Sequence, residues 1–224
     1  MAADGWASHE AAVADLARVI AAIPLRGIDA TLCRAVRAKY LDREPPEPLY
    51  YLGSSKVGAR YTPLGGPPAL YLATDQTTAF AEIQDLFFNP FRHPLPLLPR
   101  DPVTLVYVRV ALGGMLDLTD GGTLRRLGLG TDALQGEWRP AMEAWVAGRG
   151  GLPLTQRLGL AAHLTGRVRG IWFQSARARE GRCLAVFPDR LVPSAGDAVE
   201  AYDSSGRYAQ HLPAALQTEQ RHAA

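Results

Sequence analysis

The first residues of the chain carry apolar side chains at steps of three and four positions. From Ser8 to Ile23 this spacing places the apolar side chains on one face of a helix, and Pro24 ends the pattern. The apolar positions are Val13, Leu16, Ile20 and Ile23. The sequence therefore predicts an N-terminal amphipathic helix within residues 1–25.

Short apolar runs further along the chain are typical of strands that are buried in a sheet. These runs lie at residues 28–36, 49–52, 69–73, 103–112, 168–174 and 183–187. Two helices are predicted between them, one that starts at Thr74 or Asp75 and ends near residue 88, and one over 155–165. Because Gly113 and Gly114 follow the fourth run, we expect that strand to end there.

The predicted helices and strands do not alternate strictly along the chain. This order favours an α+β domain with a mixed sheet and surrounding helices over a doubly wound parallel sheet. We expect the domain to span residues 26–209, with a helical insertion around 120–151. The residues from 210 to 224 lose the pattern, and we expect a flexible tail there.

Composition narrows the class of protein. The 224 residues are 47% hydrophobic, which is enough for one domain with a proper core. Lys plus Arg number 24 and Asp plus Glu number 22, so the net charge of +2 is too small for a surface that coats nucleic acid. No charge-free stretch has the length of a membrane span, and we expect no membrane association. Two cysteines cannot build a disulfide framework, so we expect a cytoplasmic protein.

Familiar catalytic and binding motifs do not explain the chain. Gly128, Gly130 and Ala133 fit a degenerate dinucleotide-binding spacing, but a polar helical sequence precedes them where a strand is required. The five histidines share no metal-ligand spacing, and we predict no metal. No Gly-x-Ser-x-Gly nucleophile elbow occurs.

Four residues stand out by their positions. Glu82 lies in or beside the apolar stripe of the helix predicted over 74–88, where a carboxylate is costly unless something pairs with it or uses it. Tyr71 lies in a buried strand, Arg60 in a glycine-flanked loop, and Ser175 at the end of a strong strand. Each has an ordinary alternative: a glutamate that reaches solvent, a core tyrosine, a solvated arginine and a turn serine.

Taken in order, the segments around these residues resemble the RES domain, the toxin half of bacterial Xre–RES toxin–antitoxin pairs. The resemblance runs from about residue 28 to residue 191. The segments that carry it are Leu32-Cys-Arg34-Ala-Val36, Gly58-Ala-Arg60-Tyr61, Leu70-Tyr71-Leu-Ala73, Ala79-Phe-Ala-Glu82, Gly170-Ile-Trp-Phe-Gln-Ser175-Ala-Arg177 and Leu184-Ala-Val-Phe187-Pro188. Tyr61 stands where the family often has Trp, and the middle over 120–151 is longer than in compact members.

The resemblance implies an ADP-ribosyltransferase-like fold and an enzyme that takes NAD as its substrate and breaks the bond between nicotinamide and ribose, with phosphate or water as acceptor. It also implies NAD depletion, growth arrest and a cognate Xre-type antitoxin as partner. It places catalytic roles on Glu82, Arg60 and Ser175, and NAD-binding roles on Arg34, Arg60, Tyr61, Tyr71 and Ser175.

These residue types suit that chemistry. Guanidinium groups bind phosphate oxygens bidentately, which fits Arg34 and Arg60 to the pyrophosphate of NAD. Nicotinamide leaves as a neutral molecule, so one carboxylate, Glu82, can suffice to stabilise the positive charge that develops on the ribose. The face of Tyr71 can contact the cationic ring, and Ser175 can hydrogen-bond nicotinamide or ribose.

Two alternatives stay open at this point. Transfer of ADP-ribose from NAD to a protein side chain would use the same site. A non-catalytic nucleotide- or DNA-associated regulator would use the basic loop at residues 177–182, although neither the net charge nor a recognition motif supports DNA binding.

Overall fold

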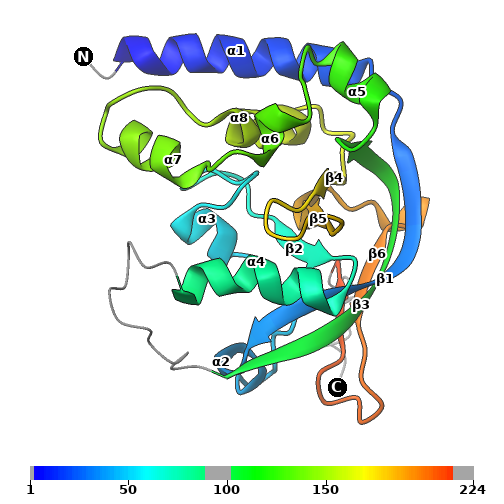
Figure 1. The fold of residues 1–224 in the computed structure, drawn as a ribbon. Helices are drawn as coiled ribbons and strands as arrows, with labels where there is room; N and C mark the ends of the chain where they lie inside the picture. The colour runs from blue at the N-terminus through cyan, green and yellow to red at the C-terminus, as the bar shows by residue number, and fades with distance from the viewer. Residues whose placement is uncertain (1–2, 89–101, 214–224) are drawn as a thin grey trace, which may run out of the picture.

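The computed structural model describes residues 3–88 and 102–213, and in this part of the chain seven strands form one mixed sheet (Figure 1). The strand order is β1-β2-β5-β4-β3-β6-β7. The pairing of β3 with β4 is parallel and the other pairings are antiparallel. The strands are β1 (Arg26–Arg37), β2 (Leu70–Ala73), β3 (Val103–Asp117), β4 (Gly170–Gln174), β5 (Arg182–Val186), β6 (Ala198–Ala201) and β7 (Gln210–Leu212).

The sheet closes on itself through β3. One edge of β3 pairs with β1, and the other edge pairs with β6 and, nearer its end, with β4. Because β1 also pairs with β2 at Cys33 opposite Ala73, the path β1-β2-β5-β4-β3 returns to β1. β6 and β7 extend the sheet outside this circuit.

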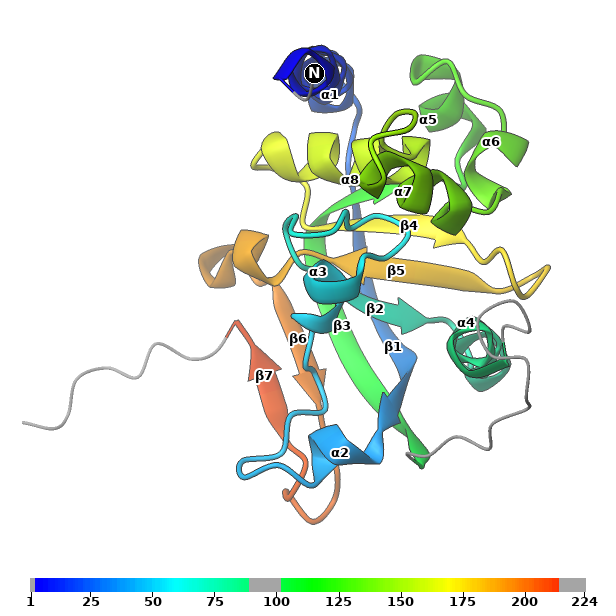
Figure 2. The ribbon, with the colours of Figure 1, turned by 90° about the vertical axis from the view of Figure 1, so that its left-hand side faces the viewer.

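Three long helices cover one face of the sheet. Shorter helices lie around them in the segments 38–57 and 120–151 (Figures 1 and 2). α1 packs along α8, and α4 crosses β1 and β2. The helices are α1 (Ala3–Ala21), α2 (Ala38–Leu41), α3 (Gly53–Val57), α4 (Gln76–Phe88), α5 (Gly121–Arg126), α6 (Asp132–Gln135), α7 (Arg139–Val146) and α8 (Leu154–Leu164), with 3₁₀ turns η1 (Pro188–Arg190) and η2 (Pro193–Ala195). None of these helices combines the length and apolar character needed to cross a bilayer.

Two apolar cores follow from the alternation of side chains along the strands. The first lies under the helices, where Ile20 of α1 and Leu158 of α8 meet Leu116, Ile171 and Ala185 of the sheet. The second takes buried residues from every strand except β4, together with Leu49 and Leu191, and the partly buried Trp172 of β4 packs against it. The candidate site borders the first core.

Most expected elements form, and the α+β class is confirmed. The helices predicted within 1–25, over 74–88 and over 155–165 correspond to α1, α4 and α8, and the helical insertion contains α5, α6 and α7. Strands also form at the runs around 28–36, 69–73, 103–112, 168–174 and 183–187.

Three local expectations are wrong. Residues 49–52 form a turn rather than a strand, and Leu49 instead anchors this turn in the second core. Residues 210–212 form β7 rather than a tail, and residues 214–224 lie outside the described part of the chain. The third concerns Gly113 and Gly114, where β3 does not end.

Gly114 lies within β3, and a neighbouring turn packs into the space that a side chain at this position would fill. A Cβ at Gly114 would lie 2.6 Å from the carbonyl oxygen of Arg167. The amide of Arg169 donates to the Gly114 carbonyl oxygen at 2.6 Å. The glycine therefore brings the turn before β4 against β3, rather than ending the strand.

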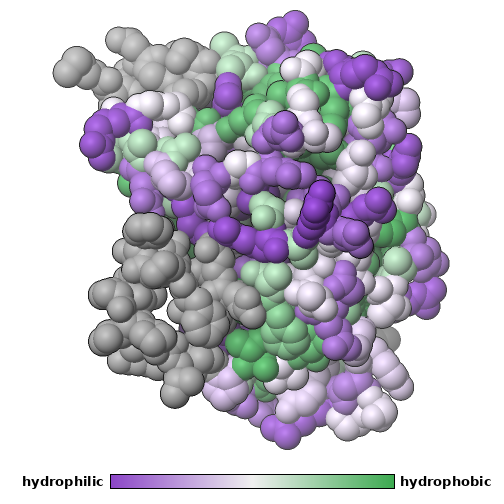
Figure 3. Space-filling view, viewed as in Figure 1, coloured by the Kyte–Doolittle hydropathy of each residue, from purple (hydrophilic) through white to green (hydrophobic). Residues whose placement is uncertain are grey.

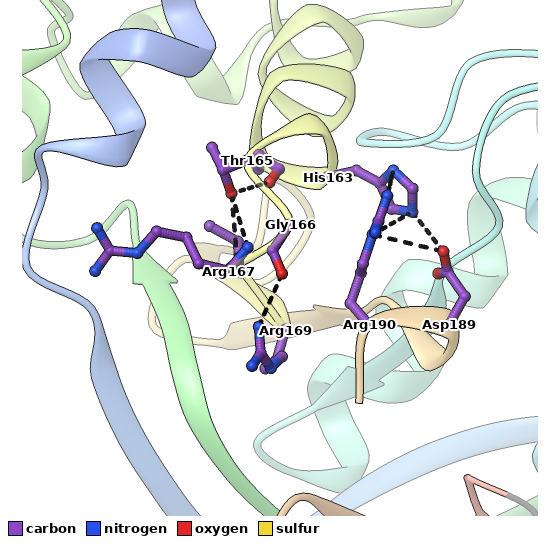
Figure 4. A network of polar contacts seen from close by, with 9 residues as sticks. His163, Thr165, Gly166, Arg167, Arg169, Asp189 and Arg190 are labelled. Carbon is purple, nitrogen blue, oxygen red and sulfur yellow. Dashed lines mark hydrogen bonds and ion pairs between the residues drawn. The ribbon is translucent and has the colours of Figure 1, made fainter. Parts of the chain in front are cut away.

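Polar contacts fasten this same turn at the start of β4 (Figure 4). Thr165 Oγ1 accepts from the amide of Arg167 at 3.3 Å, and Arg169 Nη1 donates to the Gly166 carbonyl oxygen at 3.1 Å. Nearby, His163 Nε2 lies 2.7 Å from Asp189 Oδ2, which joins the end of α8 to η1.

Candidate active site

The loop of residues 58–62 is clamped onto α8 by its backbone. Gln156 Nε2 donates to the carbonyl oxygens of Ala59, at 3.0 Å, and Thr62, at 3.3 Å. A Cβ at Gly159 would lie 1.9 Å from the Tyr61 carbonyl oxygen, so only glycine lets α8 approach this closely. The loop therefore holds its side chains in fixed directions.

Tyr71 ties the same loop to β2. Its hydroxyl oxygen accepts from the amide of Tyr61 at 3.0 Å and shares a hydrogen bond of 3.0 Å with Thr62 Oγ1. Burial raises the pKa of Tyr71 to about 12, so the hydroxyl stays protonated at neutral pH. Tyr71 thus helps to hold the loop of residues 58–62, whatever contact its ring makes with a ligand.

Arg60 connects the loop to the helical insertion. Its side chain is nearly buried, with 7% of the residue exposed. Nη1 donates to the carbonyl oxygens of Leu134, at 2.8 Å, and Gly136, at 3.3 Å, at the end of α6. Arg60 therefore fixes the position of the insertion relative to the site.

Tyr61 lies beneath the site in the first core. Its ring packs against Phe173, with ring centroids 4.7 Å apart. Its hydroxyl is buried and has no hydrogen-bond partner among the described residues. Burial raises the pKa of this hydroxyl, so it remains a neutral donor.

Glu82 and Ser175 come from distant parts of the chain and meet at the end of β4. Ser175 Oγ donates to Glu82 Oε1 at 2.6 Å. Ser175 Oγ also accepts from the amides of Arg177, at 3.0 Å, and Ala178, at 2.9 Å. Ser175 is 3% exposed and Glu82 is half-buried, so the serine fixes the carboxylate from the protein side.

The start of α4 sets the place of Glu82. Asp75 caps the helix, since its Oδ1 accepts from the amide of Thr78 at 2.8 Å. A Cβ at Gly181 would lie 2.1 Å from Thr78 Oγ1, so the loop after Ser175 presses directly on the first turn of α4. This contact brings Ser175 within reach of Glu82.

A cleft of about 610 Å³ opens beside Ser175. Its volume lies in the range of ligand-binding pockets. The described residues that line it are Leu118, Thr119, Thr131, Leu134, Gln135, Phe173, Gln174, Ser175, Ala176, Arg177 and Arg179. No Asp or Glu is among these described lining residues, so the wall favours an anionic or polar ligand.

Several guanidinium groups lie close enough to Glu82 to interact with it electrostatically. The pKa of Arg139 is lowered by burial first and then by the positive charges of Arg177 and Arg60, while Glu82 and Glu143 act in the opposite direction. Burial, followed by the negative charge of Glu82, raises the pKa of the Cys183 thiol. Glu82 therefore shares this region with Arg60, Arg139 and Arg177 and with the carboxylate of Glu143.

Arg34 does not join these residues. In β1, Cys33 packs into the first core, so Arg34 points to the opposite face, on the side of Leu32. Its guanidinium donates to the carbonyl oxygens of Pro48, at 3.2 Å, and Tyr50. Burial lowers its pKa to about 10. The structure thus gives Arg34 contacts to the loop after α2, away from Glu82.

The structure brings together Arg60, Tyr61, Tyr71, Glu82 and Ser175 and adds residues that the sequence did not single out. Gln156 is fully buried in α8 and holds the loop of residues 58–62. A buried glutamine beside the apolar stripe of a helix is the same kind of signal that marked Glu82. Arg177 and Arg179 belong to the basic loop at residues 177–182, which the sequence offered to the non-catalytic alternative and not to this site, and Arg139 carried no signal. Within residues 3–88 and 102–213, no group of three His, Cys, Asp or Glu side chains is placed to hold a metal ion.

Comparisons with known proteins agree with this fold. The family model of the RES domain matches residues 31–213. A chain of the M. tuberculosis MbcT–MbcA toxin–antitoxin complex is similar in structure, with a TM-score of 0.60 and 19% sequence identity over 84% of this chain and 89% of that chain. A comparison with curated proteins found no match.

Proposed function

Because the chain belongs to the RES domain family, we propose that it is the toxin of a toxin–antitoxin pair and that it cleaves the bond between nicotinamide and ribose in NAD. The observation that carries the proposal is the 2.6 Å contact of Glu82 with Ser175 beside a cleft whose described lining includes no Asp or Glu. A carboxylate held by Ser175 at the border of a cleft that is lined by arginines suits a dinucleotide substrate with a cationic ring.

The reaction needs little from the protein beyond charge and position. The bond between C1′ and the nicotinamide nitrogen breaks, and its electron pair neutralises the pyridinium. The ribose becomes positively charged, and the Glu82 carboxylate stabilises that charge without transferring a proton. An oxygen of phosphate or water then forms the new bond to C1′, and where water is the acceptor its proton passes to the solvent.

The other residues orient the Glu82 carboxylate and the substrate. Ser175 holds one oxygen of Glu82, so the carboxylate keeps its direction as the charge develops. Arg60 and Tyr71 fix the loop and the insertion, and the ring of Tyr71 offers a face for the pyridinium. Tyr61 supports this assembly from below.

The comparison structure supports a protein partner. The similar M. tuberculosis chain is part of a toxin–antitoxin complex. We extend the proposal to a cognate antitoxin of the Xre type that silences this chain, and to action on the cytoplasmic NAD pool.

Nicotinamide release from NAD tests the proposal directly. We expect purified protein to release nicotinamide, with or without added phosphate, and Glu82→Gln to release it about 10²–10³-fold more slowly. The substitution keeps the shape and the hydrogen bond of the side chain but removes its charge. No release by the wild type, or equal release by Glu82→Gln, would contradict the proposal.

Intact-mass measurement separates the acceptors. Cleavage with phosphate or water leaves protein masses unchanged, whereas transfer of ADP-ribose adds its mass to a protein. An ADP-ribosylated target together with negligible free product would replace NAD degradation by protein modification at the same site.

A further inference from the structure

The loop between β4 and β5 is held by several hydrogen bonds within the loop itself. Gln174 Nε2 donates to the carbonyl oxygens of Arg179, at 2.7 Å, and Gly181, at 2.9 Å. Ser175 contributes its amide, which donates to Gly181 O at 2.9 Å, and its hydroxyl, which accepts from the amides of Arg177 and Ala178. The loop is therefore held in one shape before any ligand binds.

This loop presents two guanidinium groups to the cleft. Arg177 and Arg179 both line it, beside the hydroxyl and amide side chains of Thr119, Thr131 and Gln135. On the face seen in Figure 1, hydrophilic residues form a band at the level of α7 and this loop (Figure 3). Five guanidinium donors on each arginine and neutral polar neighbours match a ligand that has several oxygen acceptors and negative charge.

Arg177 also forms an ion pair beside the cleft, and a phosphate group can compete with it. Arg177 Nη2 lies 2.7 Å from Glu137 Oε1, and the two side chains are 30% and 53% exposed. A partly exposed pair of this kind contributes little to stability, so a phosphate group can replace the carboxylate.

The arginines expected to bind phosphate are committed elsewhere. Arg34 lies on the other face of the sheet, and Arg60 Nη1 donates to two carbonyl oxygens of the insertion. We propose that Arg177 and Arg179 form the phosphate-binding subsite of this cleft. The inference rests on the proposed function for its ligand, which is either the pyrophosphate of NAD or the inorganic phosphate that accepts ADP-ribose.

Calorimetric titration with phosphate-bearing probes tests the subsite without turnover. The probes are ADP, inorganic phosphate and adenosine, and the proteins are wild type, Arg177→Gln/Arg179→Gln and the control Arg182→Gln. Arg182 is an exposed arginine next to the same loop that does not line the cleft. We expect the double substitution to weaken binding of a phosphate-bearing probe at least about tenfold and to leave adenosine unaffected.

The pattern of loss identifies the source of the phosphate. Weaker ADP binding assigns the subsite to the pyrophosphate, and weaker binding of inorganic phosphate alone assigns it to the acceptor. The subsite is refuted if both probes bind the double variant as they bind the wild type, if Arg182→Gln weakens them equally, or if neither probe binds the wild type.

The two proposals fail in different experiments. Arginine-dependent ADP or phosphate binding without nicotinamide release by the wild type refutes the NAD reaction and leaves the subsite intact. Nicotinamide release with unchanged probe binding in the double variant refutes the subsite alone.

Discussion

A carboxylate lies near each end of β4, and the two differ in how many hydrogen-bond donors the protein gives them. Near the start of β4, the side chain of Asp197 is 1% exposed and accepts from Arg169 Nε at 3.0 Å and from the amides of Gly113, at 2.8 Å, and Val192, at 2.9 Å. At the other end, Glu82 accepts from Ser175 Oγ among the described donors and remains half-buried. Asp197 has its donors within the protein, whereas Glu82 keeps acceptor capacity for a ligand.

The neighbouring clefts differ in the same way. The cleft of about 320 Å³ beside Asp197 contains Arg167 and Arg169. Arg169 binds Asp197, and Arg167 Nη1 donates to the Ala21 carbonyl oxygen at the end of α1. A cluster of charges is therefore structural where its members satisfy one another, and it suggests a ligand where the described lining of a cleft includes arginines and no carboxylate.

The largest expected effect is on stability, at the satisfied end. Asp197→Ala leaves Arg169 without its carboxylate and two backbone amides without their acceptor, so we expect a loss of about 3–5 kcal/mol in the free energy of unfolding. Urea denaturation measures this loss. Glu82→Ala, the matched change at the other end, should cost far less than Asp197→Ala, and the isosteric Glu82→Gln should unfold within about 0.5 kcal/mol of the wild type.

The comparison breaks if Asp197→Ala and Glu82→Ala behave alike. Equal unfolding free energies for Asp197→Ala and wild type would show that the Asp197 contacts contribute nothing. A large loss of stability in Glu82→Gln would show that Glu82 is also a structural acid, and its lost activity would then be a folding effect.

The next effect concerns the hydroxyl that joins Glu82 to the protein. Ser175→Ala removes the donor to Glu82, and we expect kcat for nicotinamide release to fall about 10–100-fold, as for the loss of a hydrogen bond to a charged group. KM for NAD should change less, because Ser175 acts through the carboxylate. Steady-state kinetics separates the two constants.

A conservative variant distinguishes positioning from loop structure. Ser175→Thr keeps the hydroxyl and should recover most of kcat, while Ser175→Ala with a normal kcat would remove Ser175 from the mechanism. A rise in KM with unchanged kcat would instead favour direct contact between Ser175 and NAD.

The sequence predicts those parts of the fold that have a local period. The apolar stripes of α1, α4 and α8 and the apolar runs of five strands are local signals, and they are enough for the α+β class. Residues 49–52 mislead because their apolar side chains reach the second core from a turn. The glycine pair misleads because its role, close approach of the turn before β4, depends on a segment more than fifty residues away.

The site is predicted in part for a related reason. Glu82 is conspicuous because a carboxylate beside an apolar stripe needs a partner, but only the fold shows that the partner is Ser175. Arg34 fits the motif and still faces away, because one step along a strand reverses the face. Arg177 and Arg179 sit in a loop without periodicity, so their place in the cleft follows from tertiary structure alone.

The smallest effect involves a third carboxylate, Asp75, which is exposed and yet fully engaged with the start of α4. Its oxygens accept from the amide of Thr78 at 2.8 Å, from Thr78 Oγ1 at 2.7 Å and from Thr74 Oγ1 at 2.9 Å. These bonds, that from the Thr78 amide above all, lower the pKa of Asp75 below its ordinary value of 3.8. We expect Asp75→Ala to cost about 1 kcal/mol of stability at neutral pH and Asp75→Asn, which keeps a capping oxygen, to cost less.

The pH dependence follows from the direction of that shift. Since the folded state holds the Asp75 proton less tightly than the unfolded state, its contribution is complete above pH 3.8 and is lost as the pH falls through the lowered pKa. Thermal melts between about pH 2 and pH 7 should therefore converge for wild type and Asp75→Asn at the acid end. Parallel melts across this range would show that Asp75 caps α4 without its charge. The satisfied carboxylate would then act through geometry alone, in contrast to Glu82, whose charge is the property that the proposed reaction requires.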